Sequence, residues 1–439
     1  MPDAAPTPTA SHNPLLRPTV SRAVVGLAAA GLAAGCGGDE ETARLDWEAT
    51  RDTVGDTIIV RTVAGSVWGK ARLVEELRIG QFDGPEEYTF GQIAAIRTGA
   101  DGTLYVLDQQ PASLRAYSPE GEFMRQLAGH GEGPGEINRP DAGLAILPDG
   151  RILVRDPAGA RISVFGADGG YETEWRIRGG SFTSTPLYVD RTGHVYQQLF
   201  EFDPDGSRMW LVRHSPAGEP IDTLPVPQGD APQLMAVNEG PNGTSSSSTS
   251  VPFWPVLDTE LSPDGAIALG YPATYSIVIP RTDRVLRIER AFEPVPVLDD
   301  ERDNRRERTI HNMRRTEAGW NWDGPDIPDT KPAFRSMMFD EDGRLWVLLY
   351  TRAERIPDEE IEPPEEGTDA PPPTRWREPS RFDVFESDGS YLGRLELPRG
   401  FSIYPRPAIR GDRVWAVVLD ELDVPYLVRY RIEVEPPRP

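Results

Sequence analysis

Residues 101–127 read DGTLYVLDQQPASLRAYSPEGEFMRQL. Asp101-Gly102 has the composition of a tight turn, because glycine adopts a positive φ without a Cβ clash. A second turn, Ser118-Pro119-Glu120-Gly121, lies further along. Around these turns are three short runs of apolar or alternating residues, at 104–107, 114–117 and 123–127. The stretch therefore predicts three short strands joined by tight connections.

The same pattern recurs about six times along the chain. Turn pairs similar to Asp101-Gly102 occur at 149–150, 192–193, 264–265, 342–343 and 411–412. An apolar run precedes each turn and two or three strand-like runs follow it, which predicts four strands per repeat. Repeated four-stranded units are typical of blades that pack face to face around a channel. We therefore expect an all-β fold, a six-bladed β-propeller of four-stranded antiparallel blades over residues 57–436.

The sixth repeat lacks its outermost strand, because the chain ends soon after Tyr430. Residues 73–79 are a candidate for that strand. They run into GQFDGPEE at 80–87, which resembles the link GHGEGPGE at 129–136 that follows the last strand of the first repeat. This register predicts that residues 73–79 pair with the C-terminal blade and close the ring, hiding an open sheet edge. Residues 58–68 are expected to form an extra strand or strap outside it.

The N-terminal residues have the composition of an export signal. Arg17 and Arg22 supply positive charge, and no acidic residue lies between Asp3 and Asp39. The apolar run at 23–34 suits a signal segment and is too short to span a bilayer comfortably. We therefore expect this part of the chain to be separate from the folded domain.

The apolar run ends in LAAGC at 32–36, which resembles the lipobox of bacterial lipoproteins. Ala33 departs from that pattern, in which leucine is more usual. The resemblance implies that residues 1–35 are a signal peptide and that Cys36 becomes the lipidated N-terminus. An ordinary signal peptide followed by a stray cysteine is the alternative. Residues 36–56 are polar and acidic, so we expect a flexible tether there.

The repeats, with the Gly-x-Gly-Pro-Gly-Glu link at 131–136, resemble NHL-type six-bladed propellers and the secreted six-bladed propeller proteins of bacteria. The resemblance covers residues 57–435. It implies a fold and says little about a ligand. Six-bladed lactonases and lyases use residues that line the channel, but no such set can be matched here residue by residue.

Charge and histidine spacing exclude several kinds of site. The chain has 46 basic and 70 acidic residues, a formal net charge of −24. Acidic proteins are repelled by phosphate backbones, so we expect no nucleic-acid partner. The five histidines are not at zinc-ligand spacing. We therefore predict no metal or other cofactor, with a metal such as calcium in the channel as the alternative.

Loop lengths divide the two faces of the expected propeller. In a four-stranded meander, links between strands one and two, and three and four, lie on one face, and these are all short. The long insertions at 227–253, 294–333 and 352–379 all belong to the opposite face, where we expect recognition to occur. Residues 299–315 are acidic at their start and basic at their end, which predicts a short helix. The serine-rich run at 245–248 is expected to be a flexible flap.

Candidate ligand-binding residues lie in these insertions or at the ends of the inner strands. They are His130, Arg139, Asp141, Trp254, Trp320, Trp322, Arg335, Tyr404 and Arg406. Arginine and aromatic side chains that converge on a channel suit an anionic or carbohydrate ligand, and loop tryptophans can anchor a peptide. The structural alternatives are buried ion pairs that orient loops and tryptophans that plug the channel mouth.

The sequence thus favours an exported, lipid-anchored propeller that binds a protein, peptide or carbohydrate in the cell envelope. The domain is expected to be monomeric and to contact the membrane only through its lipid. The alternative is a hydrolase, lactonase or lyase acting at the channel mouth. A third possibility is a structural partner in an envelope complex, which would expose an apolar patch.

Overall fold

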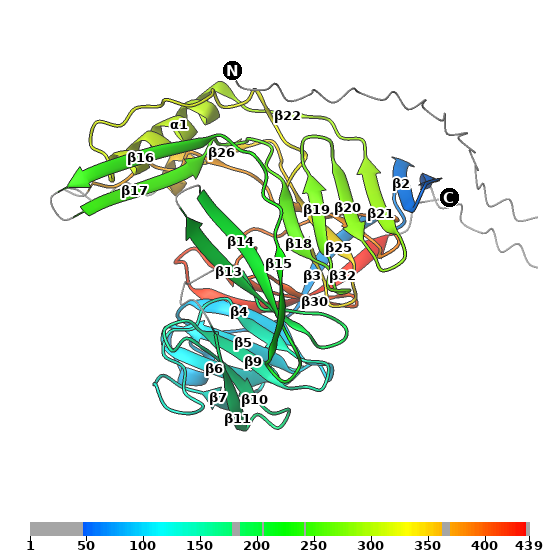
Figure 1. Ribbon diagram of the computed structural model, residues 1–439, viewed down its shortest axis with the longest axis vertical. Helices are drawn as coiled ribbons and strands as arrows, with labels where there is room; N and C mark the ends of the chain where they lie inside the picture. The colour runs from blue at the N-terminus through cyan, green and yellow to red at the C-terminus, as the bar shows by residue number, and fades with distance from the viewer. Residues whose placement is uncertain (1–46, 178–184, 204–205, 241–242, 362–368, 436–439) are drawn as a thin grey trace, which may run out of the picture.

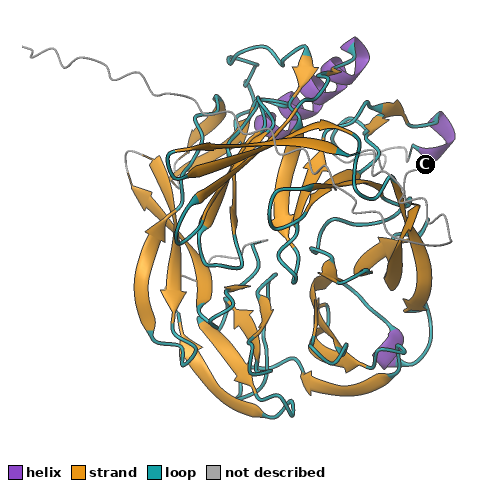
Figure 2. Ribbon diagram, turned by 90° about the vertical axis from the view of Figure 1, so that its right-hand side faces the viewer, coloured by secondary structure: helices purple, strands orange, loops and turns teal. Residues whose placement is uncertain are grey.

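The computed structural model describes residues 47–177, 185–203, 206–240, 243–361 and 369–435. These residues are nearly all β-structure and include one α-helix, α1 (Asp299–Arg314). The strands form many small sheets, which Figure 2 shows arranged around a common centre. Within the described ranges no helix is both long and apolar enough to cross a bilayer. The predicted signal peptide lies outside the described residues.

Most strands belong to antiparallel meanders whose members pair in chain order (Figure 1). The first meander contains β4 (Ile93–Thr98), β5 (Leu104–Gln109), β6 (Ala112–Tyr117) and β7 (Phe123–Ala128). The second contains β8 (Leu144–Ile146), β9 (Ile152–Asp156), β10 (Arg161–Phe165) and β11 (Tyr171–Arg176). The third contains β12 (Tyr188–Val189), β13 (Val195–Asp203), β14 (Gly206–His214) and β15 (Pro220–Pro225). The fourth contains β18 (Asp258–Leu261), β19 (Ile267–Tyr271), β20 (Ser276–Pro280) and β21 (Val285–Arg290).

The repeated turns produce these meanders as the sequence predicts. Gly102 and Gly150, each between the first and second strands, have φ of 86° and 89°, a region that residues with a Cβ rarely adopt. The second strands β5 and β9 are almost completely buried, because neighbouring sheets cover both of their faces. The cores between sheets are built from these strands.

The remaining strands form one eight-stranded sheet. Its order is β24 (Phe334–Phe339), β25 (Leu345–Leu349), β28 (Arg381–Phe385), β29 (Tyr391–Glu396), β3 (Lys70–Ile79), β32 (Pro425–Glu435), β31 (Arg413–Leu419) and β30 (Ala408–Arg410). β3 pairs antiparallel with β32 along its length and meets β29 only at Ala71 and Arg72. The predicted pairing of residues 73–79 with the C-terminal strand is therefore confirmed.

A β-bulge marks the pairing of β3 with β32. The register passes from Glu75 to Leu77, so Glu76 is the extra residue. Its carboxylate accepts a hydrogen bond from Nε of Arg431 at 3.1 Å and lies 3.2 Å from Nε of Arg429. The bulge thus places one carboxylate between two arginines of the opposite strand.

The segment before β3 pairs first with β21 of the fourth meander and then with β29 of the eight-stranded sheet. β2 (Thr57–Ala64) pairs parallel with β21, which confirms the extra strand predicted at 58–68. Backbone N–H groups of Val67 and Trp68 then donate to carbonyls of β29. The tether prediction is wrong for β1 (Glu48–Val54), which pairs with β2. The residues of β1 are mostly polar, but a strand that stays exposed to solvent does not require apolar residues. Arg61 of β2 also forms an ion pair with Asp52 of β1, at 2.5 Å.

The three insertions pack on one another instead of forming separate loops. The serine-rich segment is not a flap but strand β17 (Gly243–Ser250), paired with β16 (Gln233–Gly240) beside α1 (Figure 1). Leu234 and Ala236 of β16 are buried, whereas the serines face solvent, which suits a hairpin with one packed face. The helix predicted at 299–315 is confirmed. Short pairs complete the insertions: β22 (Val295–Pro296) with β23 (Thr330–Lys331), and β26 (Glu354–Arg355) with β27 (Trp376–Arg377).

A buried lysine joins the insertions to the sheets. Nζ of Lys331 lies 2.7 Å from the carboxylate of Glu301 in α1 and 3.3 Å from that of Glu378, and it donates to the carbonyl of Thr351 at 3.1 Å. All three charged side chains are almost fully buried. Because a buried charge without its partner is costly, this cluster ties α1 to the chain around β25.

The Ile79→Ala variant tests the contribution of the β3–β32 pairing. Ile79 is buried in a core with Trp415 and Leu427, so its truncation should lower the free energy of unfolding by about 2–4 kcal/mol. Val63→Ala, at an exposed site on β2, is the control and should cost about 0.5 kcal/mol or less. Urea unfolding followed by tryptophan fluorescence measures both. Equal stability of the two variants would contradict a stabilising role for β3.

Candidate functional site

A cavity of about 560 Å³ is bordered by β4, β8, β12 and β18, the first strands of the four meanders, and by β24 and β30, the two edge strands of the eight-stranded sheet. The lining also includes the short turns that follow these strands, among them Asp101, Asp190 and Pro263. The cavity therefore reaches the face of short turns. This differs from the expectation that recognition occurs on the face with the long insertions, because the insertions pack together and the central space is left to the inner strands.

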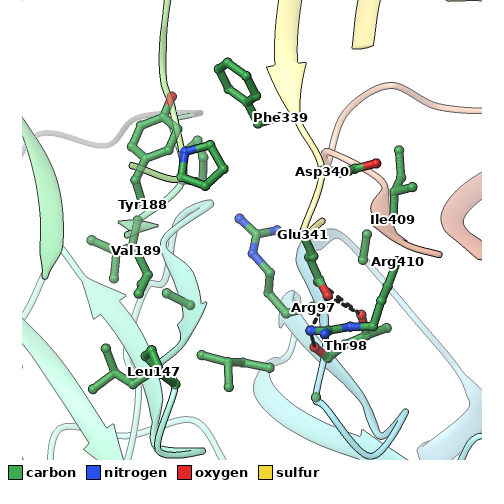
Figure 3. A pocket seen from close by; sticks show the side chains of 18 of the residues that line it. Arg97, Thr98, Leu147, Tyr188, Val189, Phe339, Asp340, Glu341, Ile409 and Arg410 are labelled. Carbon is green, nitrogen blue, oxygen red and sulfur yellow. Dashed lines mark hydrogen bonds and ion pairs between the residues drawn. The ribbon is translucent and has the colours of Figure 1, made fainter. Parts of the chain in front are cut away.

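Two ion pairs occupy opposite parts of the cavity wall. Arg406 pairs with Glu260 of β18, and its Nη2 donates to Oε2 at 2.8 Å. The Tyr188 hydroxyl donates to the same oxygen at 3.1 Å. Across the cavity, Nη2 of Arg410 lies 2.5 Å from Glu341, which also accepts a hydrogen bond from Oγ1 of Thr98 at 3.0 Å (Figure 3). Each carboxylate is thus matched by one guanidinium.

Arg97 lies between these pairs. Figure 3 shows its side chain extending from β4 into the cavity, with Tyr188 on one side and Glu341 on the other. Nη1 donates to the carbonyl of Ile96 at 2.8 Å, and within the described ranges no carboxylate lies at ion-pair distance from this guanidinium. Burial lowers the pKa of Arg97 and Glu341 partly offsets this, but an arginine remains charged in proteins. The cavity centre therefore holds one unpaired positive charge.

Asp258 is placed next to the charged wall by strand geometry. Residues two apart on a strand share a face, so Asp258 and Glu260 of β18 lie side by side. Burial, and then the negative charge of Glu260, raises the pKa of Asp258 to about 7. The Met337 backbone N–H donates to Asp258 Oδ2 at 2.7 Å, which holds the carboxyl in place. Close to neutral pH this group can exchange a proton.

Asp340 has a structural role at the cavity rim. Burial raises its pKa to about 6. Its oxygens accept hydrogen bonds from Nε1 of Trp346 at 2.9 Å and from the backbone N–H of Arg344 at 2.8 Å. These bonds hold the turn between β24 and β25.

Of the residues proposed from sequence, Arg406 lines the central cavity. Asp141 is buried and accepts a hydrogen bond from Nε of Arg155 at 2.9 Å, as expected for an ion pair that orients a loop. The backbone N–H of Arg139 donates to Asp156 at 3.1 Å, and His130 forms a β-bridge with Ile137. The structure does not gather these residues around one site.

The other proposed residues lie in two separate places. Trp254, Trp320 and Trp322 belong to the apolar core shared by the β16–β17 hairpin and α1, where Trp320 is buried and donates to the carbonyl of Met235 at 2.7 Å. Arg335 lies 2.6 Å from Glu378 beside the same core. Tyr404 is 63% exposed and lines a different cavity of about 330 Å³. A ligand role for these residues stays a prediction.

Sequence reasoning missed Arg97, Tyr188, Glu260 and Glu341. A signal for two of them was present: Arg97 ends the otherwise apolar run IAAIR at 93–97, and Glu260 lies within a strand next to Leu261. Charges on strands expected to be buried are costly unless they are paired or functional. Their convergence depends on the tertiary structure and could not be read from spacing.

The structure shows no metal-binding site among the residues that it describes. No group of three or more His, Cys, Asp and Glu side chains there is arranged to hold an ion. The cavity carboxylates Glu260 and Glu341 instead contact arginines.

Comparisons with known proteins give a fold likeness only. No family description and no curated sequence matches the chain. Among solved structures, a Bacteroides fragilis protein named as exported has 11% identity and a TM-score of 0.45, covering 87% of this chain and 99% of that chain. A DUF4221 member from Bacteroides vulgatus has 11% identity and a TM-score of 0.43, covering 84% and 100%. A Xanthomonas campestris gluconolactonase has 14% identity and a TM-score of 0.38, covering 79% and 87%. These neighbours are propeller-like, and their identities are too low to transfer a function.

The Asp258→Asn variant should be more stable than the parent at pH 8 by about 1–3 kcal/mol. The folded-state pKa of Asp258 is raised to about 7, so the native state holds its proton more tightly than the unfolded state does. The parent therefore loses stability as pH rises from about 4 to 7, whereas the neutral amide does not. Urea unfolding at pH 4.5, 6 and 8 measures the difference.

Asp283→Asn is the control for this pH series. Asp283 is exposed, and its hydrogen bond with Arg284 lowers its pKa, so this variant should not gain stability as pH rises. An Asp258→Asn stability curve parallel to that of the parent would show that the carboxyl is not perturbed.

Proposed function

We propose that this chain is an exported, lipid-anchored, six-bladed β-propeller that binds a small organic anion in its central cavity. The observation that carries the proposal is the position of Arg97, whose charge is unpaired among the described residues while the neighbouring carboxylates are matched. A guanidinium in a partly desolvated site binds a carboxylate or phosphate strongly, because its planar donors match the oxygens of the anion.

A six-bladed ring accounts for the arrangement of the strands. The first strands of successive meanders border one cavity, and β3 joins the N-terminal segment to the C-terminal strand. A closed ring of this kind protects the edge of β32 from pairing with another chain. It also gives the cavity a rigid wall, which lowers the entropic cost of binding.

The acidic groups of the cavity already have bonding partners, and this favours binding over catalysis. Hydrolysis or elimination needs a base or nucleophile directed at the substrate. Glu260 accepts from Arg406 and Tyr188, and Glu341 from Thr98 as well as pairing with Arg410. Both carboxylates are engaged in holding the wall, and Asp258, which does not line the cavity, is held by the Met337 backbone N–H. This leaves the guanidinium of Arg97 as the group that faces a ligand.

The proposed export and membrane anchoring are based on the N-terminal sequence. Cys36 ends the lipobox-like LAAGC segment and lies outside the described residues. In this proposal it carries the lipid, and the following residues up to β1 connect it to the propeller. Because β1 begins at Glu48, the connection is shorter than the composition alone indicates.

The Arg97→Gln variant should lose anion binding by at least about tenfold, because it removes the charge and the bidentate donor. Titration calorimetry or ligand-observed NMR with acetate, benzoate and inorganic phosphate measures the affinities. Arg284→Gln, on an exposed turn outside the cavity, is the matched control and should bind as the parent does. Equal affinities of the two variants, or no binding of any probe to the parent, would refute the proposed function.

The Cys36→Ser variant tests the anchor in the bacterial cell. The parent should fractionate with membranes and incorporate labelled palmitate, whereas the variant should lose the label and most of its membrane association, since one lipidated cysteine supplies the whole anchor. Membrane flotation followed by immunoblotting measures the distribution. Retention of the label in the variant would exclude Cys36 as the lipid site.

A further inference from the structure

A separate cavity of about 330 Å³ lies between the start of β4 and the turn that joins β31 to β32. β4 contributes its first residues, Ile93 and Ala94, whereas its last residues, Arg97 and Thr98, line the central cavity. The two cavities share no lining residue and lie at opposite ends of β4. The smaller one has the size of a small-molecule pocket, since such pockets start at about 300 Å³.

The wall of this second cavity combines apolar and polar side chains. The apolar ones include Ile93, Pro405, Val417, Leu419 and Pro425. The polar ones are Gln92, Gln109, Ser402, Tyr404 and Asp423. Among the described residues of this lining, Asp423 alone carries a charge, so the wall is apolar with one negative group.

Tyr404 presents an exposed aromatic ring at this cavity. The backbone N–H of Ser402 donates to the carbonyl of Val417 at 2.8 Å, and the Tyr404 N–H donates to Oγ of Ser402 at 3.2 Å. These bonds hold the loop, yet Tyr404 remains 63% exposed. The face of an aromatic ring attracts a cation through its quadrupole. The cavity therefore has a cation-attracting surface on a loop that is held in place.

The carboxylate of Asp423 is available to a ligand. It forms no ion pair or hydrogen bond with the residues that the structure describes. Asp420, in the same turn, is engaged instead, because it accepts hydrogen bonds from the backbone N–H groups of Leu422 at 2.8 Å and Val424 at 3.0 Å. Asp420 thus shapes the turn and leaves the charge of Asp423 uncompensated.

We infer that this cavity binds an organic cation, an ammonium or guanidinium group joined to a compact apolar body. The cation pairs with Asp423 and contacts the face of Tyr404, and the apolar body packs against Val417 and its apolar neighbours. The net charge of the chain, −24, favours the approach of a ligand of this sign. A free amine and a lysine or arginine side chain of another polypeptide share this chemistry. The inference does not depend on Arg97 or on the anion proposed for the central cavity.

The same wall disfavours anions and sugars. An anion meets the carboxylate of Asp423 and no lysine or arginine of the described lining. A sugar brings several hydroxyl groups, but the side-chain amide of Gln109 already donates to the carbonyl of Pro140 at 2.7 Å. Hydroxyl groups that lose water against apolar side chains without a new partner carry a high cost.

The test compares 2-phenylethylamine, 2-phenylethanol and glucose on the parent chain by calorimetry and ligand-observed NMR. The amine and the alcohol have the same body and differ in charge. The amine should bind at least about threefold more tightly, because an exposed ion pair and a cation–π contact both favour it. Added salt should reduce this preference, since it screens exposed charges. Equal affinities of amine and alcohol, displacement of the amine by glucose, or binding of no probe would overturn the inference.

Substitutions of the turn separate the local charge from the net charge. Asp423→Asn should abolish the preference for the amine while the alcohol still binds. Asparagine tolerates the positive φ of this position, 57°, so the turn is retained. Glu421→Gln is the matched control, because Glu421 lies in the same turn and outside the lining. Equal losses of amine affinity in the two variants would show that the cavity does not use Asp423, and the inference would fail.

Substitutions of Tyr404 test the aromatic contact. Tyr404→Ala should weaken binding of the amine about fivefold, whereas Tyr404→Phe keeps the ring and should change it less than about twofold. Circular dichroism checks that both variants fold. An unchanged affinity in a folded Tyr404→Ala variant would contradict the assignment. Neither result affects the anion binding proposed for Arg97, which acetate titration of the same variants measures.

A peptide comparison identifies the source of the cation. A short peptide with one lysine and the same peptide with glutamine in its place are titrated under the same conditions. Tighter binding of the lysine peptide than of 2-phenylethylamine, dependent on Asp423, supports the site and assigns it to a side chain of a partner polypeptide. The reverse order supports the site and assigns it to a free amine.

Discussion

The pairing of β3 with β32 is the interaction on which the rest of the structure depends. A meander of four short strands has open edges and buries too little surface to be stable alone. The C-terminal strand β32 would have such an edge if the chain followed its sequence order strictly. The early segment β3 covers it, and the carboxylate of Glu76 between Arg429 and Arg431 fixes the register of the pair. The sheets are then held in place to enclose the central cavity.

The cavity itself illustrates the cost of burying charge. Glu260 would be destabilising at its position without Arg406, because an unpaired buried carboxylate loses its hydration. Burial, and then the charge of Glu260, raises the pKa of Asp258 to about 7, although Arg406 acts in the opposite direction. Arg97 is the opposite case, a cation with no carboxylate at ion-pair distance among the described residues. This asymmetry is the reason for proposing that the cavity binds an anion.

The insertions contribute to stability more than to the cavity. Their shared core of Leu234, Trp320 and neighbouring residues, with the buried Lys331 cluster, forms one packed unit on the side of the long links. The tryptophans that the sequence offers as ligand contacts are used for packing there. The face with short turns carries the cavity, because no insertion fills the space between the inner strands.

Much of the architecture could be predicted from local sequence. Turns such as Asp101-Gly102 and Asp149-Gly150 specify a conformation that depends on neighbouring residues, and the strands around them follow from apolar patterning. The link that follows residues 73–79 matched the link after the first repeat, and this identified the partner of β32. The helix at Asp299–Arg314 followed from its terminal charges.

The site could be predicted only in part, since Arg406 alone among the proposed residues lines the central cavity. Arg97, Tyr188 and Glu260 come from three different meanders and Glu341 follows β24 of the eight-stranded sheet, so no local pattern relates them. Whether a charge is paired depends on which side chains reach it in space, and that is decided when the inner strands come together. The sequence by itself determined the strands, their turns and the partner of β32, because these depend on neighbouring residues or on a repeated motif. Only the tertiary structure decided which charges are compensated, because compensation is a long-range property of the assembled core.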